Sequence, residues 1–321
     1  MAILAFDFGT TFGRAWLVEN GRILSASRER GGARDVAQGR QRGWVIDLLL
    51  RLARSALEEA GAEWSSVDAA VAFGMITSEL GLEEVPHLEA PVGIKDIAGA
   101  LREHRVEELP VPLFLVPGVR SPNDGIELSD VMRGEETEVV GLVSSPEVRL
   151  PLVFVSTGSH TKFVFVDTDS RICWSVTTLS GELIWALHRE TILSKLVDPS
   201  HSLDDLSFVE RGARAVQAGG LSRALFATRL LNVLAGADPN KCSDFLYGAV
   251  AEADIQCLRT TVRARGLMKA SVVVTKGTAL AEAYAHLLSG EPWVDEITIL
   301  EGALGPSGAW RLYVARETGA A

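Results

Sequence analysis

Short apolar runs separated by glycine-containing turns open the chain. Residues 3–6 and 15–18 are apolar runs, and a turn rich in glycine and threonine lies between them. Runs of this length between turn residues predict buried strands, and Asn20-Gly21, which follows the second run, is a strong signal for a two-residue hairpin. The pattern therefore predicts three successive strands, with the third at residues 22–25.

The same pattern returns about half a chain later. An apolar run at residues 152–155 leads through a Ser/Thr/Gly turn into a second run at residues 162–166, and a third strand is predicted at residues 172–176. Two copies of one supersecondary unit indicate a duplicated architecture, with a nucleotide clamped between the two halves. The boundary between the halves is expected near residues 144–151.

Between and after these strands, apolar residues recur at the three-to-four-residue spacing of helices. Helices are predicted in a segment that begins at Glu135, with acidic residues in its first turn, and at residues 46–57, 97–101, 183–196, 206–216, 221–234, 245–265, 280–288 and 309–315. Further buried strands are predicted at residues 67–73, 113–116, 272–274 and 297–300. This alternation is typical of an α/β protein.

Composition and charge narrow the classes of function. The chain has 321 residues, long enough for two domains, and a hydrophobic fraction of 47%, which is typical of a well-packed protein. A formal net charge of −11 argues against non-specific binding to nucleic acid or to an anionic membrane. Three cysteines, Cys173, Cys242 and Cys257, lack paired metal-binding spacing and suit a reducing compartment. Because neither a signal-peptide pattern nor a membrane-length apolar run is seen, a cytoplasmic protein is expected.

The turn after the first strand is the first candidate for ligand binding. Its backbone N–H groups and the hydroxyls of Thr10 and Thr11, beside Gly9, suit a phosphate group. Asp7 lies at the edge of this turn, where a carboxylate can hold Mg²⁺ directly or through water. The alternative is an ordinary hairpin with a solvated aspartate.

A second candidate is the segment that leaves the strand at residues 67–73. Ligands of α/β sheets bind at the ends of strands, so Gly74, Met75 and Ser78 are candidates for one wall of a substrate site. A plain connection between two elements is the alternative.

Taken together, these motifs resemble those of the superfamily of sugar kinases, heat-shock chaperones and actin. The shared features are Asp-x-Gly-Thr in the first hairpin, a Gly/Thr-rich second hairpin, and a glycine turn near Gly277 before a helix. Within the superfamily, the chain is similar to the 2-dehydro-3-deoxygalactonokinase family. The similarity extends from Asp7 to Thr278 and rests on the blocks Arg14–Leu17, Gly74-Met75 with Ser78, Met132–Thr137, Thr157–Lys162, Ser180–Leu183 and Ser243–Gly248.

The resemblance implies a fold and an activity. The fold is α/β, with two ribonuclease H-like lobes, each a mixed β-sheet flanked by helices, and an ATP cleft between them. The expected lobes are residues 1–147 and 148–304, followed by a C-terminal helix at residues 305–321, whose return to the first lobe is one alternative. The expected activity is transfer of the γ-phosphoryl group of ATP to the terminal 6-hydroxyl of 2-dehydro-3-deoxy-D-galactonate, in galactonate catabolism, with Mg²⁺ as the metal.

Phosphoryl transfer needs in-line positioning, neutralised charge and a carboxylate that accepts the hydroxyl proton. In related sugar kinases, this base lies in the first turn of the helix before the second phosphate hairpin, where this chain has Glu135 and Glu136. Adjacent helical residues point about 100° apart, so only one of them can face a cleft, and Glu135 is the choice. Alternatively, both acids are solvated and merely suit the helix dipole.

The resemblance also suggests binding roles. Asp7 would organise Mg²⁺. The nucleotide would contact Gly9, Thr10, Thr11, Thr157, Gly158, Ser159 and Lys162 through its phosphates, and Gly277 and Thr278 near its adenosine. The substrate carboxylate needs a cation from Arg14, Arg133 or Lys162, and His160 is a further candidate for contact with substrate or phosphate. Each cation could equally form a surface ion pair, and His160 could be a structural histidine.

Three rival functions remain open at this stage. A kinase for another 2-keto-3-deoxy sugar acid or sugar is a close variant. A non-transferring ATPase of the chaperone or filament type would need an added domain or assembly surfaces, for which 321 residues leave no room. A sugar-responsive repressor would need an N-terminal DNA-binding module, whereas this sequence opens at the phosphate strand. The expected partners are ATP and a small sugar acid, not nucleic acid or membrane, and a homodimer is compatible with the sequence.

Overall fold

The computed structural model of the chain describes residues 1–122 and 125–319. The chain divides into two compact units: unit 1 contains Met1–Val148, Asp167–Trp174 and Ala303–Ala321, and unit 2 contains Arg149–Val166 and Ser175–Gly302. The predicted lobes place residues 167–174 in the second lobe, whereas these residues belong to unit 1, and the predicted boundaries at 147/148 and 304/305 differ from those of the units by one and two residues. Ala320 and Ala321 of the predicted C-terminal helix lie outside the described residues.

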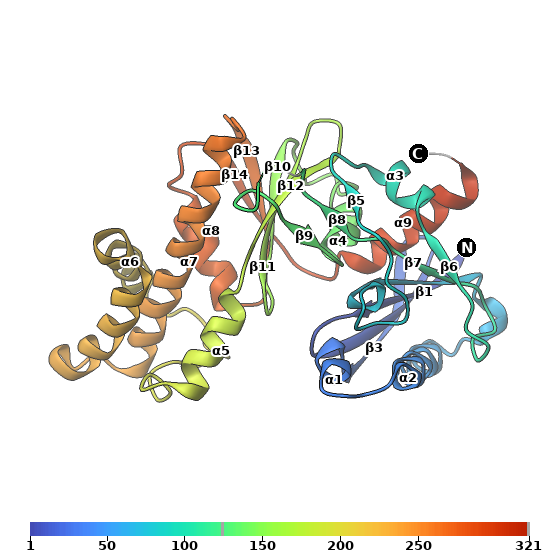
Figure 1. The fold of residues 1–321 in the computed structure, drawn as a ribbon, viewed down its shortest axis with the longest axis horizontal. Helices are drawn as coiled ribbons and strands as arrows, with labels where there is room; N and C mark the ends of the chain where they lie inside the picture. The colour runs from blue at the N-terminus through green and yellow to red at the C-terminus, as the bar shows by residue number, and fades with distance from the viewer. Residues whose placement is uncertain (123–124, 320–321) are drawn as a thin grey trace. The chain divides into compact units, whose positions relative to one another are not determined.

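Unit 1 is built on a six-stranded mixed sheet (Figure 1). Its strands are β1 (Ala2–Phe8), β2 (Phe12–Glu19), β3 (Arg22–Arg30), β4 (Ala69–Gly74), β6 (Arg102–His104) and β7 (Leu113–Leu115). They lie in the order β3-β2-β1-β4-β7-β6. β1 is antiparallel to β2 and parallel to β4, β4 is parallel to β7, and β6 is antiparallel to β7. The predicted Asn20-Gly21 hairpin is confirmed, since φ is 48° and 79° at the two residues, as a type I′ turn requires.

Alternation along β1 divides its side chains between the two faces of the sheet. Leu4, Phe6 and Phe8 are fully buried in one apolar cluster with residues of helix α2 (Arg42–Ala60). Ile3 and Ala5, which point to the other face, are also fully buried. Both faces of this strand are therefore covered, which is why its sequence is a continuous apolar run.

Helix α9 (Gly305–Thr318) returns from the end of the chain to unit 1, where it contacts β1, β4, α3 (Ile94–Gly99) and α4 (Glu135–Leu142) (Figure 1). The contact with α4 depends on glycine. An ideal Cβ on Gly308 would lie 1.8 Å from the carbonyl oxygen of Thr137, and one on Gly141 would lie 2.3 Å from that of Leu304. Only glycine at these positions lets the two helix backbones touch.

Several short elements of unit 1 were not predicted. They are helix α1 (Ala33–Ala37), the 3₁₀ turns η1 (Trp64–Ser66) and η2 (Met75–Thr77), and a small sheet of β5 (Leu88–Glu89), β8 (Val119–Arg120) and β9 (Val131–Met132). Two-residue strands carry no periodicity of their own, so their pairing depends on contacts distant in sequence.

Unit 2 repeats the design of unit 1. Its sheet is formed by β10 (Leu152–Ser156), β11 (Thr161–Val166), β12 (Ile172–Thr178), β13 (Ala270–Thr275) and β14 (Val294–Leu300), in the order β12-β11-β10-β13-β14. The first three residues of β12, 172–174, are counted with unit 1. β10 is antiparallel to β11 and parallel to β13, which is parallel to β14. This strand order corresponds, strand for strand, to β3-β2-β1-β4-β7 in the sheet of unit 1. The predicted α/β class with a duplicated mixed sheet is confirmed.

The helices of unit 2 are α5 (Ser180–Glu190), α6 (Leu206–Ala235), α7 (Pro239–Ala264) and α8 (Ala279–Leu288). α6 is interrupted at Gly220, where φ is 76° and ψ is 167°. This break separates the two helical segments that the sequence predicts. α7 starts earlier than predicted because Asp238 caps it, accepting a hydrogen bond from the Lys241 N–H, and proline follows at its first position.

The prediction of one helix over residues 183–196 is wrong in its second half, because α5 ends at Glu190. Thr191 explains the end. Its hydroxyl donates to the Leu187 carbonyl at 2.6 Å and accepts from the Leu193 N–H at 3.1 Å. A side chain that bonds the backbone on both sides offers the chain an alternative to the next helical turn.

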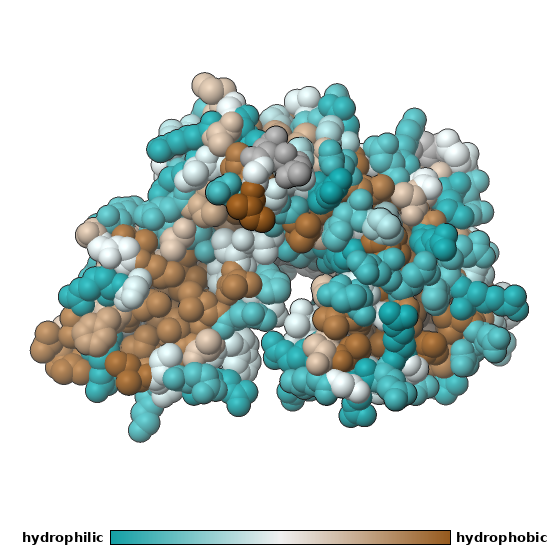
Figure 2. All heavy atoms as spheres, in the orientation of Figure 1, coloured by the Kyte–Doolittle hydropathy of each residue, from teal (hydrophilic) through white to brown (hydrophobic). Residues whose placement is uncertain are grey.

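Some apolar side chains remain on the surface of unit 2. Figure 2 shows apolar residues gathered over α6, where Phe226, Val233 and Leu234 are exposed. Among the residues that the structure describes, no helix combines the length and apolarity needed to cross a bilayer.

Candidate active site

The first Gly/Thr turn joins β1 to β2, and the segment after β3 packs against it. Backbone N–H groups of that segment donate to the carbonyls of the turn: Ala33 to Gly9 (3.0 Å), Arg34 to Thr10 (3.0 Å) and Gly31 to Thr11 (2.9 Å). An ideal Cβ on Gly32 would lie only 2.3 Å from the Gly9 oxygen. The segment Gly31–Arg34, here called the first cover, therefore fixes the shape of the turn.

The second turn, between β10 and β11, has the same arrangement. The Glu182 N–H donates to the Ser159 carbonyl at 2.9 Å. An ideal Cβ on Gly181 would lie 1.9 Å from the carbonyl oxygen of Gly158. Residues Ser180–Glu182 are thus a second cover, and the duplication extends to the way in which each turn is held.

Asp7 faces Arg14 across β1 and β2, and the Asp7 Oδ2 and Arg14 Nη1 atoms form an ion pair at 2.5 Å. The two side chains are 19% and 39% exposed. Burial raises the pKa of Asp7 above its usual value, and the Arg14 charge opposes that rise. No group of three or more metal-ligating His, Cys, Asp or Glu side chains occurs within residues 1–122 and 125–319. This donor set suits Mg²⁺ held by one carboxylate and a substrate's phosphates, not by a protein cage.

Two glycines bring the ends of β4 and α4 close to Asp7. Gly74 has a φ of +83°, and a Cβ there would lie 3.2 Å from the Asp7 Oδ1 atom and 2.9 Å from the Phe8 oxygen. A Cβ on Gly134, where φ is +112°, would lie 3.4 Å from the Gly74 Cα atom. Unit 1 therefore gathers three predicted site positions, Asp7, Arg14 and Gly74, around the start of α4.

Glu136 is fully buried at the N-terminus of α4. Its two carboxyl oxygens accept hydrogen bonds from the Gly134 N–H at 2.7 and 3.0 Å, and one also accepts from the Thr137 hydroxyl at 3.0 Å. Burial raises the pKa of Glu136 to about 8; the charge of Glu135 adds to the rise, and the hydrogen bonds oppose it. The Glu136 side chain therefore holds the backbone of Gly134, the residue before the helix, in place.

The raised pKa of Glu136 predicts a pH-dependent stability. Because the folded-state pKa is about 8 and the ordinary value is 4.5, the folded protein holds this proton more tightly than the unfolded chain. The stabilisation is complete below about pH 4.5 and is lost as the pH rises through 8. In urea unfolding between pH 5 and 8.5, Glu136→Gln is expected to flatten the decline of the unfolding free energy with pH. If the unfolding free energies of the two proteins change in parallel with pH, the assignment of the raised pKa to Glu136 is contradicted.

Glu135 precedes Glu136 in the first turn of α4 and is only partly buried. The two acids thus differ in surroundings, since Glu136 is fully buried and bonded to backbone groups, whereas Glu135 is partly exposed with its Oε2 atom buried. Which of them is the catalytic base stays a prediction, and Glu135 is the more accessible.

Arg133 is held by the segment that follows β4. Its Nη1 atom donates to the Thr77 hydroxyl at 2.9 Å and its Nη2 atom to the Val85 carbonyl at 2.8 Å. His87 Nδ1 lies 3.4 Å from the same Nη2 atom, and burial, together with the Arg133 charge, lowers the pKa of His87 to about 4. Two guanidinium nitrogens of Arg133 therefore have structural partners.

The other two residues of the predicted substrate wall are largely enclosed. Met75 is partly buried and packs against the apolar cluster of unit 1. Ser78 is 3% exposed, and its hydroxyl donates to the Met75 carbonyl at 2.7 Å and accepts from the Leu80 N–H at 3.2 Å. Ser78 therefore shapes the turn after β4 through bonds within that turn.

In unit 2, the second turn is joined to the start of α8. The hydroxyls of Thr157 and Thr278 share a hydrogen bond at 3.1 Å. Thr278 also caps α8, since its hydroxyl accepts from the Ala281 N–H at 3.1 Å. Gly277, directly before the cap, has a φ of +135°, which favours glycine.

Charged groups lie on either side of the second turn. Lys162 is 7% exposed and pairs with Ser156 in the ladder of β10 and β11. Burial lowers the pKa of His160, and the Lys162 charge lowers it further. The Nε2 atom of His160 lies 3.9 Å from a carboxyl oxygen of Glu182, a residue of the second cover.

A buried polar network lies beneath the second turn. Asp254 of α7 accepts short hydrogen bonds from the hydroxyls of Ser180 and Tyr284, and the Tyr284 hydroxyl also bonds that of Thr161 at 3.2 Å. Ser180 begins the second cover and Thr161 ends the turn. Burial raises the pKa of Asp254, and its hydrogen bonds oppose that rise. The network ties the turn and its cover to two helices.

One of the sequence blocks has a packing role. In Ser243–Gly248, an ideal Cβ on Gly248 would lie 2.0 Å from the Val209 oxygen, and one on Gly212 would lie 1.9 Å from the Phe245 oxygen. These glycines let α6 and α7 cross in contact. The glycine of this block therefore has a packing role at a helix crossing.

Sequence interpretation missed the two covers and the Asp254–Tyr284 network. A signal for the covers was present, because each cover glycine follows the glycine of its turn by the same 23 residues, from Gly9 to Gly32 and from Gly158 to Gly181. The network had no comparable signal, since a lone Asp and a lone Tyr in apolar helical segments match many structural roles.

Comparison with known proteins decides the family. A family model for 2-keto-3-deoxy-galactonokinase matches residues 7–298. The chain belongs to this family. The predicted family resemblance is confirmed, and the chain is a sugar-acid kinase, a phosphotransferase with an alcohol acceptor. Family membership implies ATP as the phosphoryl donor.

Individual members of the family are distant in sequence. The 2-dehydro-3-deoxygalactonokinase of Escherichia coli (strain K12) is 24% identical over 282 residues, which are 88% of this chain and 87% of that protein. A relative in Rhizobium meliloti (strain 1021), assigned the same activity, is 29% identical over 194 residues. These residues are 60% of this chain and 58% of that protein.

Solved structures share the fold. A protein of Sinorhizobium meliloti assigned to this kinase family superposes with a TM-score of 0.74 at 20% identity, over 99% of this chain and 98% of that chain. An activator of 2-hydroxyisocaproyl-CoA dehydratase from Clostridium difficile, solved with bound ADPNP, superposes with a TM-score of 0.53 at 12% identity, over 99% and 97% of the two chains.

Proposed function

We propose that this kinase phosphorylates the 6-hydroxyl of 2-dehydro-3-deoxy-D-galactonate with ATP, giving the 6-phospho sugar acid and ADP, in galactonate catabolism. The family match over residues 7–298 carries the proposal. The named activity of the E. coli relative, which aligns with 88% of this chain, supports the substrate.

Glu135 is the proposed general base. It is the partly exposed acid in the first turn of α4, whereas Glu136 is fully buried and bonded to the Gly134 N–H. A base must reach the substrate hydroxyl, and a carboxyl enclosed by its own backbone cannot do so without breaking those bonds. Glu136 would instead keep Glu135 in place.

Asp7 is the proposed Mg²⁺ residue. A bound Mg²⁺ would neutralise charge on the phosphates and would be held by the Asp7 carboxylate, directly or through water. In unit 1, the proposed phosphate donors are the N–H and hydroxyl groups of Thr10 and Thr11; the N–H of the neighbouring Gly9 donates to the Phe12 carbonyl at 3.0 Å and shapes the turn. The first cover engages the carbonyls of this turn, which favours anion binding through its remaining donors.

In unit 2, the second turn and the start of α8 would bind the nucleotide. Thr157, Gly158, Ser159 and Lys162 are the proposed phosphate contacts, with Gly277 and Thr278 near the adenosine. The Thr157–Thr278 hydrogen bond supports one nucleotide-binding surface within this unit. The likeness of the fold to an activator solved with ADPNP is consistent with that proposal.

The sugar acid would bind Arg14 through its carboxylate, with Gly74 and Met75 as a wall. In unit 2, His160 stays a candidate for contact with substrate or phosphate. We prefer Arg14, in which one nitrogen bonds the Asp7 side chain, to Arg133, in which two nitrogens are bonded to Thr77 and Val85. Arg133 and Ser78 would then position the wall from behind. The three cysteines, which form no disulfide, suit the reducing cytoplasm, where we place the enzyme. A homodimer stays a prediction.

A coupled ADP-release assay over a panel of 2-keto-3-deoxy sugar acids tests the substrate. We expect turnover with 2-dehydro-3-deoxy-D-galactonate to exceed that with every other acid in the panel, and ³¹P NMR of the product to show a 6-phosphate. Faster turnover of another acid would reassign the substrate. ATP hydrolysis without any phosphorylated sugar would instead indicate a non-transferring ATPase.

A further inference from the structure

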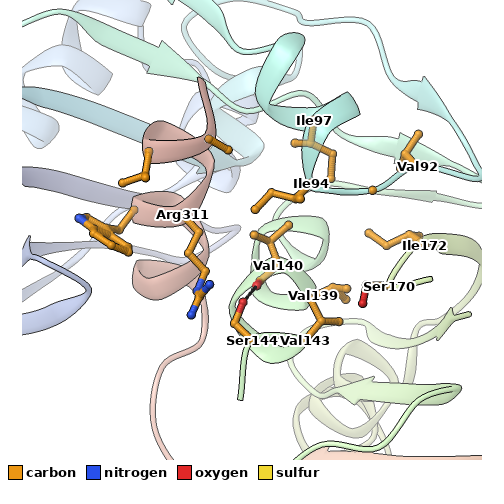
Figure 3. Close-up of a pocket in the computed structure, with 14 residues that line it drawn as sticks. Val92, Ile94, Ile97, Val139, Val140, Val143, Ser144, Ser170, Ile172 and Arg311 are labelled. Atoms are coloured by element: carbon orange, nitrogen blue, oxygen red, sulfur yellow. Dashed lines mark hydrogen bonds between the residues drawn. The ribbon is translucent and has the colours of Figure 1, made fainter. Parts of the chain in front are cut away.

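A pocket of about 360 Å³ lies within unit 1, apart from the residues assigned to the proposed reaction (Figure 3). It is formed by α3, α4, α9 and the segment around residues 170–172. Its walls are mainly valine and isoleucine side chains, among them Val92, Ile94, Ile97, Val139, Val140 and Ile172. A volume of this size is within the range of small-molecule sites.

One lining residue does not match this apolar character. Arg311 of α9 is the sole charged residue among those that line the pocket, and Figure 3 shows its side chain reaching into the space beside Val140 and Ser144. Its Nε atom is buried, and within the described part of the chain it has no hydrogen-bond partner. No acidic side chain in residues 1–122 or 125–319 forms an ion pair with Arg311 either.

An enclosed guanidinium N–H without a partner costs free energy, which a ligand oxygen at that position would recover. Carboxylates are the usual partners of arginine, and the geometry allows two parallel hydrogen bonds. The rest of the pocket would bury an aliphatic chain. A polyhydroxylated sugar acid matches these walls poorly, because its hydroxyls would lose their water without finding partners.

We propose that this pocket binds a small aliphatic monocarboxylate, with the carboxylate on Arg311 and the hydrocarbon chain against the valines and isoleucines of α3 and α4. The single cation limits the ligand to one negative charge. The pocket volume limits it to a short chain. This site does not depend on the proposed reaction, since none of its residues is assigned a role there.

Calorimetric titration of the full-length chain with sodium hexanoate and with hexanamide, its neutral counterpart, tests the proposal. Hexanoate is expected to bind one site at least tenfold more tightly than hexanamide. Arg311→Met is expected to remove that preference. Val143→Phe, which fills the pocket and leaves Arg311 in place, is expected to weaken binding of both compounds at least tenfold.

Arg14→Met is the matched control, because Arg14 is the cation proposed for the sugar-acid carboxylate. It is expected to leave hexanoate binding unchanged. Equal binding of hexanoate and hexanamide to the unmodified protein would overturn the proposal. So would a preference for hexanoate that survives in Arg311→Met and is lost in Arg14→Met, since the anion would then occupy the candidate active site.

Discussion

Glu135→Gln is expected to lower kcat by about 10²–10⁴-fold, the usual cost of losing a general base. The substitution keeps the size of the side chain and removes its ability to accept the substrate proton. KM for ATP and the melting temperature are expected to change little, because glutamine matches the shape of Glu135 and the residue is only partly buried. Steady-state kinetics with the coupled ADP-release assay measure kcat and KM, and a thermal melt measures the melting temperature.

Glu136→Gln is the paired control. Glutamine can still accept the Gly134 N–H bond, so kcat is expected to fall less than tenfold while the pH dependence of stability flattens as described above. A loss of turnover in Glu136→Gln together with full turnover in Glu135→Gln would show that Glu136, not Glu135, is the general base. It would also require the bonds that enclose Glu136 to open during catalysis.

Gly181→Ala is expected to lower kcat/KM for ATP by about 100-fold. The new Cβ would lie 1.9 Å from the Gly158 carbonyl oxygen, so the second turn must shift by about an ångström to admit it. Displacements of this size at positioning groups cost rates of this order. The effect is expected mainly in KM for ATP, measured at saturating sugar acid.

Gly99→Ala controls for the general effect of replacing a glycine. Gly99 lies in α3 with no atom within 4 Å of an added Cβ, so kcat/KM is expected to match that of the unmodified enzyme. If kcat/KM for ATP of the Gly181→Ala enzyme stays within twofold of that of the unmodified enzyme, the second cover does not control the shape of the turn. Gly32→Ala, at the first cover, is expected to act in the same direction.

The sequence predicted those parts of the fold that depend on residues close together in the chain. The run at residues 3–6 and the Asn20-Gly21 turn specify a strand and a hairpin through side-chain burial and backbone conformation, without reference to distant residues. The matching run at residues 152–155 exposed the duplication for the same reason. Thr191 ended a helix early because a side-chain bond to the backbone replaced the next turn, a choice that apolar spacing does not record.

The candidate site depends on distant contacts, and there the sequence was less informative. It chose Glu135 over Glu136 from helix geometry alone, whereas the burial of Glu136 and its hydrogen bonds from the Gly134 N–H are known only from the structure. It offered Arg133 as a substrate cation, whereas Thr77 and Val85 engage its guanidinium. The covers were overlooked because their function depends on two segments 23 residues apart meeting at a glycine.

The return of α9 to unit 1 affects how this protein is made. Strand β1 is synthesised before unit 2 and α9 after it, yet they pack together, and α9 also touches the backbone of α4 at Gly308. During translation, unit 1 therefore waits with an uncovered apolar surface while the whole of unit 2 is synthesised. Domains usually fold as they emerge, in order from the N-terminus. Here unit 1 is completed only after unit 2 has been synthesised, so the helix that bears Glu135 gains its packing partner α9 after unit 2.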